Sequence, residues 1–200
     1  MAVRHEQLWA PWRLGYIQGT DASPPVDERS LAWLPGADSG CFLCRAVAAS
    51  GDASRQNAGH ALAAGQQPPD RRNLIVGRTE LSVVMLNRYP YNNGHLLIAP
   101  LLHKGRLDEL EDVEQLDCQR TLARCIGILG RELRAEGFNV GLNLGRIAGA
   151  GLPGHLHWHI VPRWNGDTNF MATMAGIRVI PQALDALWEV LDAAWRAGGS

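Results

Sequence analysis

Apolar residues recur along the chain at two kinds of spacing, which predict two kinds of secondary structure. Short, dense runs of Leu, Ile and Val, and one run in which apolar and polar residues alternate, predict β-strands. These strands lie at about 73–78, 81–87, 94–99, 138–144 and 155–162. Spacings of three, four or six residues predict a long helix over about 109–136 and an amphipathic helix from Pro181 to about Ala197.

The long helix is predicted to bury one apolar face. The positions expected on that face are Val113, Leu116, Leu122, Ile126, Leu129 and Leu133. Cys118 and Cys125 are seven residues apart and fall near the same face, so we expect them in the core. Gly137 is expected to end the helix, because glycine commonly follows the last helical residues.

Strands grouped around one long helix predict an α+β fold with a mostly antiparallel sheet of about five strands. A chain of 200 residues suffices for one substantial core, so residues 1–200 are expected to form a single domain. Residues 1–44 are interpreted as an N-terminal arm, and residues 73–200 as the core of the domain. Residues 45–72 are rich in Ala, Gly, Gln, Pro and Asp without periodicity, which predicts a mobile insertion.

Composition and charge narrow the classes of partner. Apolar residues make up 46% of the chain and charged residues 20%, as in soluble globular proteins. A net charge of −1 offers no general attraction to nucleic acid or to an anionic membrane, so any phosphate affinity must be local. The N-terminal residues do not resemble a signal peptide, and no apolar run approaches the roughly 20 residues that cross a bilayer. We therefore expect a cytoplasmic protein that binds neither membranes nor nucleic acids.

The strand predicted at 155–162 carries three histidines. Side chains alternate between the two faces of a strand, so His155, His157 and His159 share one face, and the apolar residues between them point toward the core. Imidazole suits proton transfer, nucleophilic attack and metal ligation near neutral pH. At about 3.3 Å per residue the outer two histidines are roughly 13 Å apart, too far for one metal ion to bind all three easily. The strand is therefore predicted to be an active-site strand whose histidines have different roles.

A second candidate site is the pair of cysteines in Cys41-Phe42-Leu43-Cys44. Four cysteines in a chain of this size do not indicate a disulfide scaffold. A C-x-x-C pair in a cytoplasmic chain suggests zinc or thiol redox chemistry, and the thioredoxin-like context that redox chemistry needs is missing. Zinc is therefore favoured, and two more ligands are needed to complete a structural tetrahedron.

Several separate motifs occur in the order in which the histidine triad (HIT) family of nucleotide-binding enzymes has them. They are Leu86-Asn87-Arg88-Tyr89-Pro90, the run from Asn93-Gly94-His95 to Pro100, Asn139 to Gly145, the alternating histidines, and the continuation from Val161 to Phe170. Over about residues 73–181 the chain most resembles the branch that contains bacterial diadenosine tetraphosphate (Ap4A) phosphorylases and hydrolases. The resemblance implies the HIT fold and a homodimer.

The resemblance also implies a role for each histidine of the site. His157 would attack the α-phosphorus of a nucleotide and form a covalent nucleotidyl-histidine, while a backbone carbonyl of the same strand holds its other ring nitrogen. His159 and His95 would contact the α-phosphate or help the leaving group depart. His95 has an alternative role as a residue that caps the turn after Gly94.

Further residues match family positions that contact the nucleotide. Asn87 and Asn143 would bind ribose or phosphate, although asparagine is also common in turns. The small residues Gly149, Ala150 and Gly151 would let backbone N–H groups approach phosphate oxygens, or would form only a turn. At Gly151 many family members carry Gln, Ser or Thr, so a side-chain phosphate contact is absent here. Trp164 would either stack on a second nucleoside or close the core.

Family members with such a cysteine pair complete a zinc site with the first triad histidine and with a histidine that follows the Gly-His strand. Both are present here, as His155 and His103. The resemblance therefore implies a structural zinc ion bound by Cys41, Cys44, His103 and His155, and no organic cofactor.

Taken together, the resemblance implies an enzyme that cleaves the α-phosphate linkage of a dinucleoside polyphosphate such as Ap4A, with phosphate or water as the second substrate. Three alternatives stay open. One is a nucleoside phosphoramidase of the same fold. Another is a zinc-stabilised nucleotide sensor with little turnover, which Gly151 supports. The last is a metal-dependent hydrolase that uses the triad as ligands. His5 and His60 receive no role.

Overall fold

The computed structural model describes residues 31–49, 69–167 and 182–198 of the chain. The strands are β1 (Ile75–Arg78), β2 (Ser82–Leu86), β3 (Leu96–Pro100), β4 (Gly137–Leu142) and β5 (Trp158–Arg163). The helices are α2 (Phe42–Ala49), α3 (Pro69–Arg72), α4 (Asp112–Glu132) and α6 (Leu184–Ala197), with short 3₁₀ turns η2 (Leu107–Glu109) and η3 (Arg146–Ala148). The arm up to residue 30, with His5, and residues 50–68, with His60, lie outside the described residues. So does Pro181, the expected start of the last helix.

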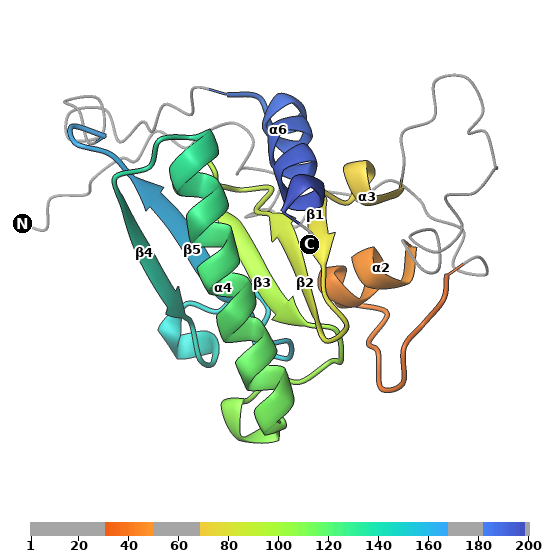
Figure 1. Ribbon diagram of the computed structural model, residues 1–200. Coiled ribbons are helices and arrows are strands. Elements are labelled where there is room, and N and C mark those ends of the chain that lie inside the picture. The colour runs from red at the N-terminus through yellow and green to blue at the C-terminus, as the bar shows by residue number, and fades with distance from the viewer. Residues whose placement is uncertain (1–30, 50–68, 168–181, 199–200) are drawn as a thin grey trace, which may run out of the picture.

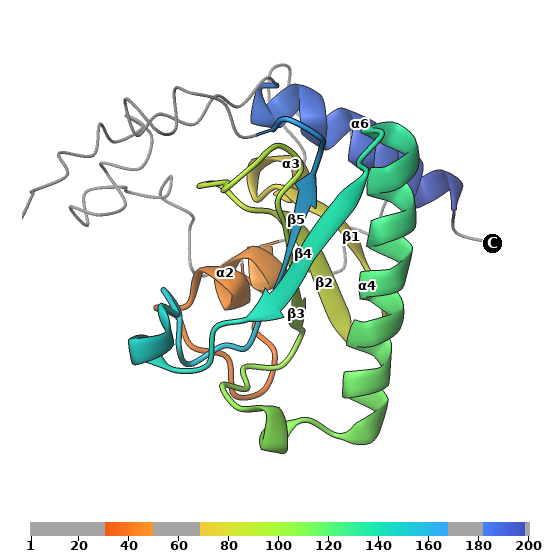
Figure 2. The same cartoon turned by 90° about the vertical axis from the view of Figure 1, so that its left-hand side faces the viewer.

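The five strands form one antiparallel sheet in the order β1-β2-β3-β5-β4, which confirms the predicted fold class. Helix α4 runs across one face of this sheet with α6 beside it (Figure 1). Viewed along the sheet, α2 lies on the opposite side from α4 (Figure 2). The sheet is thus covered by helices on both faces, although α2 is short.

The central strands β2 and β3 are buried at every position, because each face of the sheet packs against its own core. On the α4 side the core includes Val84, Leu86, Ile98, Trp158 and Ile160. On the α2 side it includes Val83, Met85, Leu97, Ala99 and Leu43. Strands buried on both faces read as continuous apolar runs, which is why β2 and β3 stand out in the sequence.

Helix α4 buries a different stripe from the one predicted. Cys118, Cys125, Leu122 and Leu129 are buried as expected, whereas Val113 and Leu116 are 63% and 50% exposed. Glu114 is buried in their stead, only 4% exposed. The prediction of Val113 and Leu116 as core residues was therefore wrong, because apolar spacing alone does not reveal that a charged residue has a buried partner.

The end of α4 also differs from the prediction. The helix ends at Glu132, and Gly137 is instead the first residue of β4. The chain reverses at Arg134, which adopts a left-handed conformation with φ of 52°. An arginine in this conformation is disfavoured by roughly 1–2 kcal/mol, so a rule based on glycine places the helix end too late.

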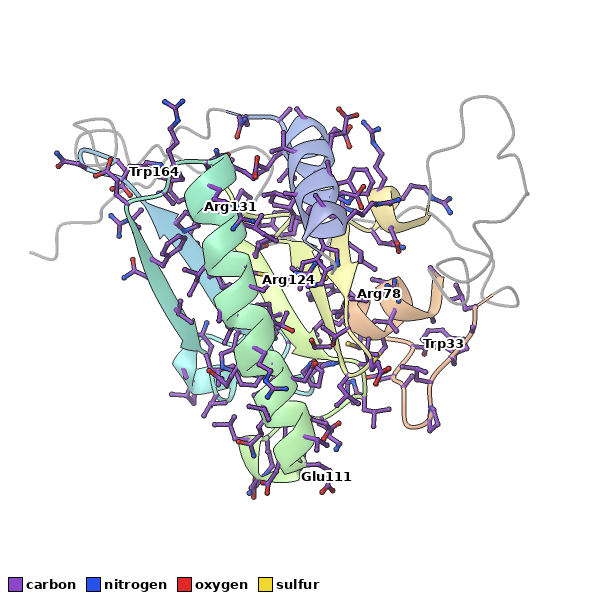
Figure 3. The ribbon with its side chains drawn as sticks, in the orientation of Figure 1. Trp33, Arg78, Glu111, Arg124, Arg131 and Trp164 are labelled. Atoms are coloured by element: carbon purple, nitrogen blue, oxygen red, sulfur yellow. The ribbon has the colours of Figure 1, made fainter. Side chains whose placement is uncertain are left out.

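Helix α6 packs on the edge strand β1 through two tryptophans. The indole N–H of Trp188 donates to the Ile75 carbonyl (2.7 Å), beside an irregularity in the β1–β2 register. Trp195 lies against Gly77, where an added Cβ would be 2.1 Å from the indole. Arg124 of α4, drawn in Figure 3, places its guanidinium 3.7 Å from the Trp195 ring centroid. Through these contacts α6 is packed against both α4 and the edge strand β1.

Two further features bear on the predictions. Helices α2 and α3 occupy the two ends of the range 45–72, where the sequence predicts no regular structure. Within the described parts of the chain, no helix is both long and apolar enough to cross a membrane.

Candidate active site and metal centre

The histidine segment keeps the predicted alternation, although its regular strand is shorter than predicted. Strand β5 begins at Trp158, three residues later than the expected start at His155. Before it, the Leu156 N–H donates to the Lys104 carbonyl (2.7 Å), which holds the segment beside the chain after β3. Leu156 packs in the core on the α4 side, and the histidines therefore lie on the α2 side of the sheet.

His157 is held in one tautomer. Its Nδ1 lies 2.8 Å from the His155 carbonyl oxygen, and a carbonyl only accepts hydrogen bonds, so Nδ1 carries the proton. Nε2 is left with a lone pair. Burial lowers the pKa of His157 from its ordinary value, and the hydrogen bond to the carbonyl acts in the opposite direction. A neutral imidazole with a free lone pair on Nε2 is the form in which histidine acts as a nucleophile.

A hydrogen-bond chain fixes the tautomers of the next two histidines. The Tyr91 N–H donates to His95 Nδ1 (3.1 Å), so His95 carries its proton on Nε2. That Nε2 lies 3.0 Å from His159 Nδ1, which must accept the bond. His159 therefore carries its own proton on Nε2. Within the part of the chain that the structure describes, this buried Nε2 has no hydrogen-bond partner.

The three rings of this chain lie close together. The centroids of His157 and His159 are 5.0 Å apart, and those of His159 and His95 are 5.2 Å apart. Tyr91 stacks on His95 at 4.9 Å. Burial, and next the neighbouring His157, lower the pKa of His159 to about 4, which leaves this ring neutral at pH 7. A nitrogen lone pair and an unpartnered N–H donor thus lie on adjacent rings, an arrangement suited to nucleophilic attack assisted by a proton donor.

The four residues of the expected metal site meet in space, and their ligand atoms all lie within 4.8 Å of one another. Cys41 Sγ is 3.3 Å from His155 Nδ1, and Cys44 Sγ is 3.3 Å from His103 Nδ1. Around a tetrahedral ion with bonds of about 2.0 Å to nitrogen and 2.3 Å to sulfur, ligand atoms are roughly 3.3–3.8 Å apart. The sulfur–nitrogen contacts of the cluster have the spacing of a tetrahedral metal centre, and all four ligand atoms lie close enough to share one ion after small shifts.

Burial and one hydrogen bond determine the protonation and the orientation of these ligands. His155 Nε2 donates to the Pro100 carbonyl (2.9 Å), so Nδ1 presents its lone pair to the sulfurs. Burial, and to a lesser extent the neighbouring Cys44, raise the pKa of Cys41 to about 12, and burial lowers the pKa of His155 to about 4. A metal ion would favour the thiolate form and binds neutral imidazole, so these residues could hold one.

The two asparagines lie on the same face as the histidines. Asn87 follows β2, and its amide nitrogen is 3.3 Å from His95 Nδ1. Its Oδ1 accepts the Tyr89 N–H (2.9 Å). Asn143 directly follows β4, whose pairing with β5 ends at Leu142 opposite Trp158, so it lies near the point where the histidine segment enters β5. Both asparagines could therefore reach a ligand bound at the histidines.

The small-residue loop Gly149–Gly151 offers fewer free N–H groups to a phosphate than the sequence suggests. The Gly149 N–H donates to the Arg146 carbonyl (3.1 Å), and the Ala150 N–H donates to the Gly145 carbonyl (3.3 Å). Gly149 has a φ of 88°, which favours glycine. In this conformation the first two amides of the loop are engaged within the turn, so a phosphate could use them only if the turn opened.

Trp164 is placed away from the histidine face. Its indole N–H donates to the Leu133 carbonyl (3.1 Å), at the C-terminal end of α4, where Figure 3 shows it. This position favours the reading in which Trp164 closes the core.

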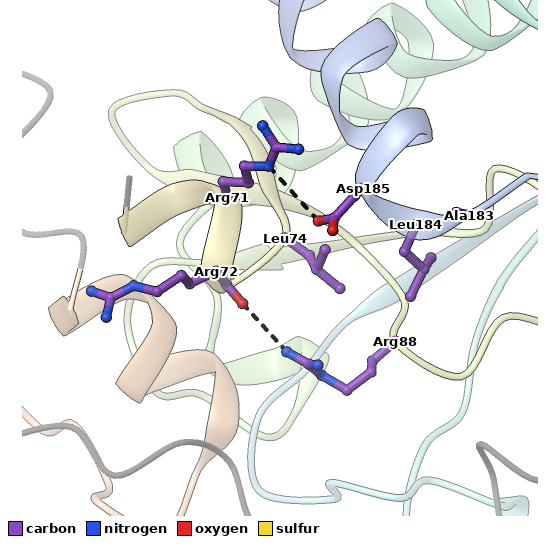
Figure 4. Close-up of a pocket in the computed structure, with 7 residues that line it drawn as sticks. All are labelled: Arg71, Arg72, Leu74, Arg88, Ala183, Leu184 and Asp185. Carbon is purple, nitrogen blue, oxygen red and sulfur yellow. Dashed lines mark hydrogen bonds and ion pairs between the residues drawn. The ribbon is translucent and has the colours of Figure 1, made fainter. Parts of the chain in front are cut away.

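Sequence reasoning missed a cleft of about 430 Å³ on another part of the molecule. Its lining residues are Arg71, Arg72, Leu74, Arg88, Ala183, Leu184 and Asp185 (Figure 4). Arg71 pairs with Asp185 (3.8 Å) and Glu189 (2.7 Å), and Arg88 donates to the Arg72 carbonyl (3.4 Å). None of the described residues that line this cleft is a histidine, and intramolecular contacts engage two of its arginines, so the histidine face is the better candidate for the functional site.

Comparison with known proteins identifies the family of the chain. A sequence model of the HIT domain matches residues 69–166. The AP-4-A phosphorylase of Mycobacterium tuberculosis is 42% identical over 129 residues, which are 64% of this chain and 66%, just under two thirds, of that protein. An uncharacterized HIT-like protein of Methanocaldococcus jannaschii is 34% identical over 46% of this chain and 70% of its own length.

A solved structure shows the same fold. A Zn-bound histidine triad family protein from Mycobacterium smegmatis superposes with a TM-score of 0.50 and 27% sequence identity, over 62% of this chain and 84% of that one. The chain belongs to the HIT family.

We expect Cys41→Ser to lower the metal content of the four-residue cluster. Loss of one thiolate from a four-ligand site weakens binding by roughly tenfold or more, so some or all of the metal would be lost during purification. The measurement is elemental analysis of purified protein, in which the unaltered chain should hold about one metal ion per cluster. Cys125→Ala, which removes a buried cysteine from the core on the α4 side, is the control and should keep its metal. Full metal content in Cys41→Ser would contradict the assignment.

Proposed function

We propose that the protein cleaves the α-phosphate linkage of dinucleoside polyphosphates such as Ap4A through a covalent AMP–His157 intermediate. The observation that carries this proposal is that a nitrogen lone pair and a free N–H donor lie on two adjacent histidine rings. His157 Nε2 presents a lone pair, and His159 Nε2 presents a buried N–H without a partner among the described residues. The likeness to the mycobacterial AP-4-A phosphorylase supports the choice of substrate class.

The proposed reaction has two steps. His157 Nε2 attacks the α-phosphorus, a nitrogen–phosphorus bond forms, and the bond to the bridging oxygen breaks. The His159 N–H donates to that oxygen as negative charge develops on it, and His95 supplies a hydrogen bond behind His159. Phosphate or water then attacks the same phosphorus and releases His157. The His155 carbonyl stabilises the partial positive charge that the His157 ring acquires during the first step.

The substrate would lie on the face shared by the histidines and the two asparagines. Asn87 and Asn143 each offer a donor and an acceptor, which suits ribose hydroxyls. Gly151 offers no side chain to the phosphates, so mainly the histidines would stabilise the negative charge at the α-phosphate. Trp164 is left out of the proposal because its indole is bound to α4.

We also propose that the ion of the four-residue cluster is zinc with a structural role. Two thiolates and two imidazoles in a buried tetrahedral arrangement are the ligand set that zinc prefers, and the related mycobacterial protein is Zn-bound. Zinc would supply a crosslink between α2 and the histidine segment. The chain's own residues carry the phosphoryl chemistry, and no organic cofactor is proposed.

His157→Gln is expected to lose covalent labelling. With Ap4A labelled in the adenosine moiety, the unaltered protein should acquire one adenylyl group, and the variant none, with turnover at least about 10³-fold lower. Glutamine keeps a polar side chain of similar length, and thermal unfolding should confirm that the variant is folded. His60→Gln, at a histidine without an assigned role, is the matched control. Full labelling or full turnover in His157→Gln would exclude the mechanism.

The second substrate can be identified from the products. Phosphorolysis of Ap4A yields ADP and ATP, whereas asymmetric hydrolysis yields AMP and ATP. We expect ADP and ATP when inorganic phosphate is present, and turnover at least about tenfold lower without it, because a bound phosphate dianion is a better-positioned nucleophile than bulk water. Chromatography of the products distinguishes the two. Equal turnover to AMP and ATP without phosphate would assign the protein to the hydrolases instead.

Homodimer formation, implied by the family resemblance, remains a proposal with support from the surface. Strand β4 pairs only with β5 among the described strands, and its exposed Val140 is 46% accessible. Val113 and Leu116 on α4 are also exposed. We expect light scattering to give twice the chain mass, and Val140→Lys to shift the protein toward monomer. A monomer in the unaltered protein would contradict this proposal.

A further inference from the structure

We propose that Lys104, through its ion pair with Glu114, is a positioning residue that holds the His155–His157 segment in its reactive geometry. The consequence for catalysis rests on the function proposed above. Lys104 Nζ pairs with Glu114, and its side chain is 21% exposed, so Lys104 would act on the histidines through its backbone.

Lys104 is bonded at both its backbone and its side chain. Its carbonyl accepts the Leu156 N–H (2.7 Å), and its Nζ lies 2.5 Å from Glu114 Oε2. Leu156 is the residue between His155 and His157. A shift of Lys104 would therefore move the peptide groups that place the His155 carbonyl against His157 Nδ1, the bond that fixes the nucleophile's tautomer.

Glu114 connects this contact to helix α4. It lies in the buried stripe of α4, with its side chain 6% exposed. The same Oε2 also accepts the Glu111 N–H (2.8 Å), which belongs to the cap of α4, labelled at Glu111 in Figure 3. A buried carboxylate is strongly destabilised without a partner, so Lys104 is held close to it. The pair thus transmits the position of α4 to the histidine segment.

Tight backbone packing makes the segment sensitive to that position. A Cβ on Gly105 would lie 3.0 Å from the Pro153 carbonyl oxygen, and a Cβ on Gly154 would lie 3.3 Å from His103 Nε2. The chain at 103–105 and the chain at 153–156 are therefore in direct backbone contact. A movement of Lys104 would therefore press on the neighbouring segment through the backbone at Gly105 and Pro153.

The test separates positioning from stability. Lys104→Met leaves the buried Glu114 without its cationic partner and should lower the melting temperature. Lys104→Met/Glu114→Leu replaces the pair with apolar groups of similar size, which commonly recovers stability. We expect this double variant to recover part of the lost melting temperature, because Glu114→Leu also removes the acceptor of the Glu111 N–H. We expect it to be adenylylated about 10- to 100-fold more slowly, with unchanged affinity for a non-hydrolysable Ap4A analogue. The apolar pair fills the space but does not direct the Lys104 carbonyl.

A second readout does not depend on the reaction. In the substrate-free protein, the Nδ1 proton of His157 should exchange slowly with water in the NMR spectrum, and faster in both variants measured below their melting temperatures. Lys104→Arg, which keeps the charge, should retain slow exchange. Unchanged exchange in both variants would overturn the positioning role, whether or not the double variant is stable. Normal exchange and normal adenylylation in a stable double variant would show a purely structural pair. Absence of adenylylation in the unaltered protein, with exchange altered as expected, would instead refute the proposed function alone.

Discussion

The geometry of the candidate site depends on two hydrogen bonds made by His155, one from its ring and one to its backbone carbonyl. Its ring N–H donates to the Pro100 carbonyl, which turns the other ring nitrogen toward Cys41 and Cys44. Its backbone carbonyl accepts the His157 N–H, which leaves the other nitrogen of that ring free. One residue therefore sets the orientation of a candidate metal ligand, its own ring, and the tautomer of the proposed nucleophile, His157. A shift of His155 in the metal cluster would therefore move its carbonyl, and with it the hydrogen bond to His157.

The position of the site follows from how far α2 covers the sheet. On that face α2 packs against strands β1 to β3, through residues such as Ile75, Met85 and Leu97. On the other half of the face, Asn139 and Gly141 of β4 are exposed. His159 lies on β5, and His155 and His157 lie on the segment before it, at the border between the covered and the open half. Burial there lowers the pKa of His157 and of His159, which favours neutral rings, while the exposed residues of β4 lie on the open half.

The sequence predicts the parts of this arrangement that depend on local periodicity. Alternation along the histidine strand correctly separated its core face from its polar face, and continuous apolar runs located β2 and β3. It could not predict the burial of Glu114, because that depends on Lys104, ten residues earlier in the chain but across a turn. Nor could it predict that Arg134 would adopt the left-handed conformation. Such features arise from tertiary contacts, which override local preference when the contact is strong enough.

The residues of the metal cluster could be predicted only in part from spacing in the sequence. Cys41 and Cys44 are recognisable as a pair by spacing, but His103 and His155 lie 59 and 111 residues from Cys44. Only resemblance to a family could join them before a structure was available. The structure adds the His155 to Pro100 bond, which no spacing rule contains.

The unpartnered N–H of His159 is the strongest physical indication of a ligand. A buried donor without an acceptor destabilises a fold by about 1–3 kcal/mol, so such groups are rare unless something else satisfies them. The hydrogen bonds from Tyr91 to His95 and from His95 to His159 leave the proton of His159 no other nitrogen to occupy. The donor is buried, on a ring whose centroid lies 5.0 Å from that of His157. An anionic oxygen that reached it would satisfy the donor and lie beside the proposed nucleophile.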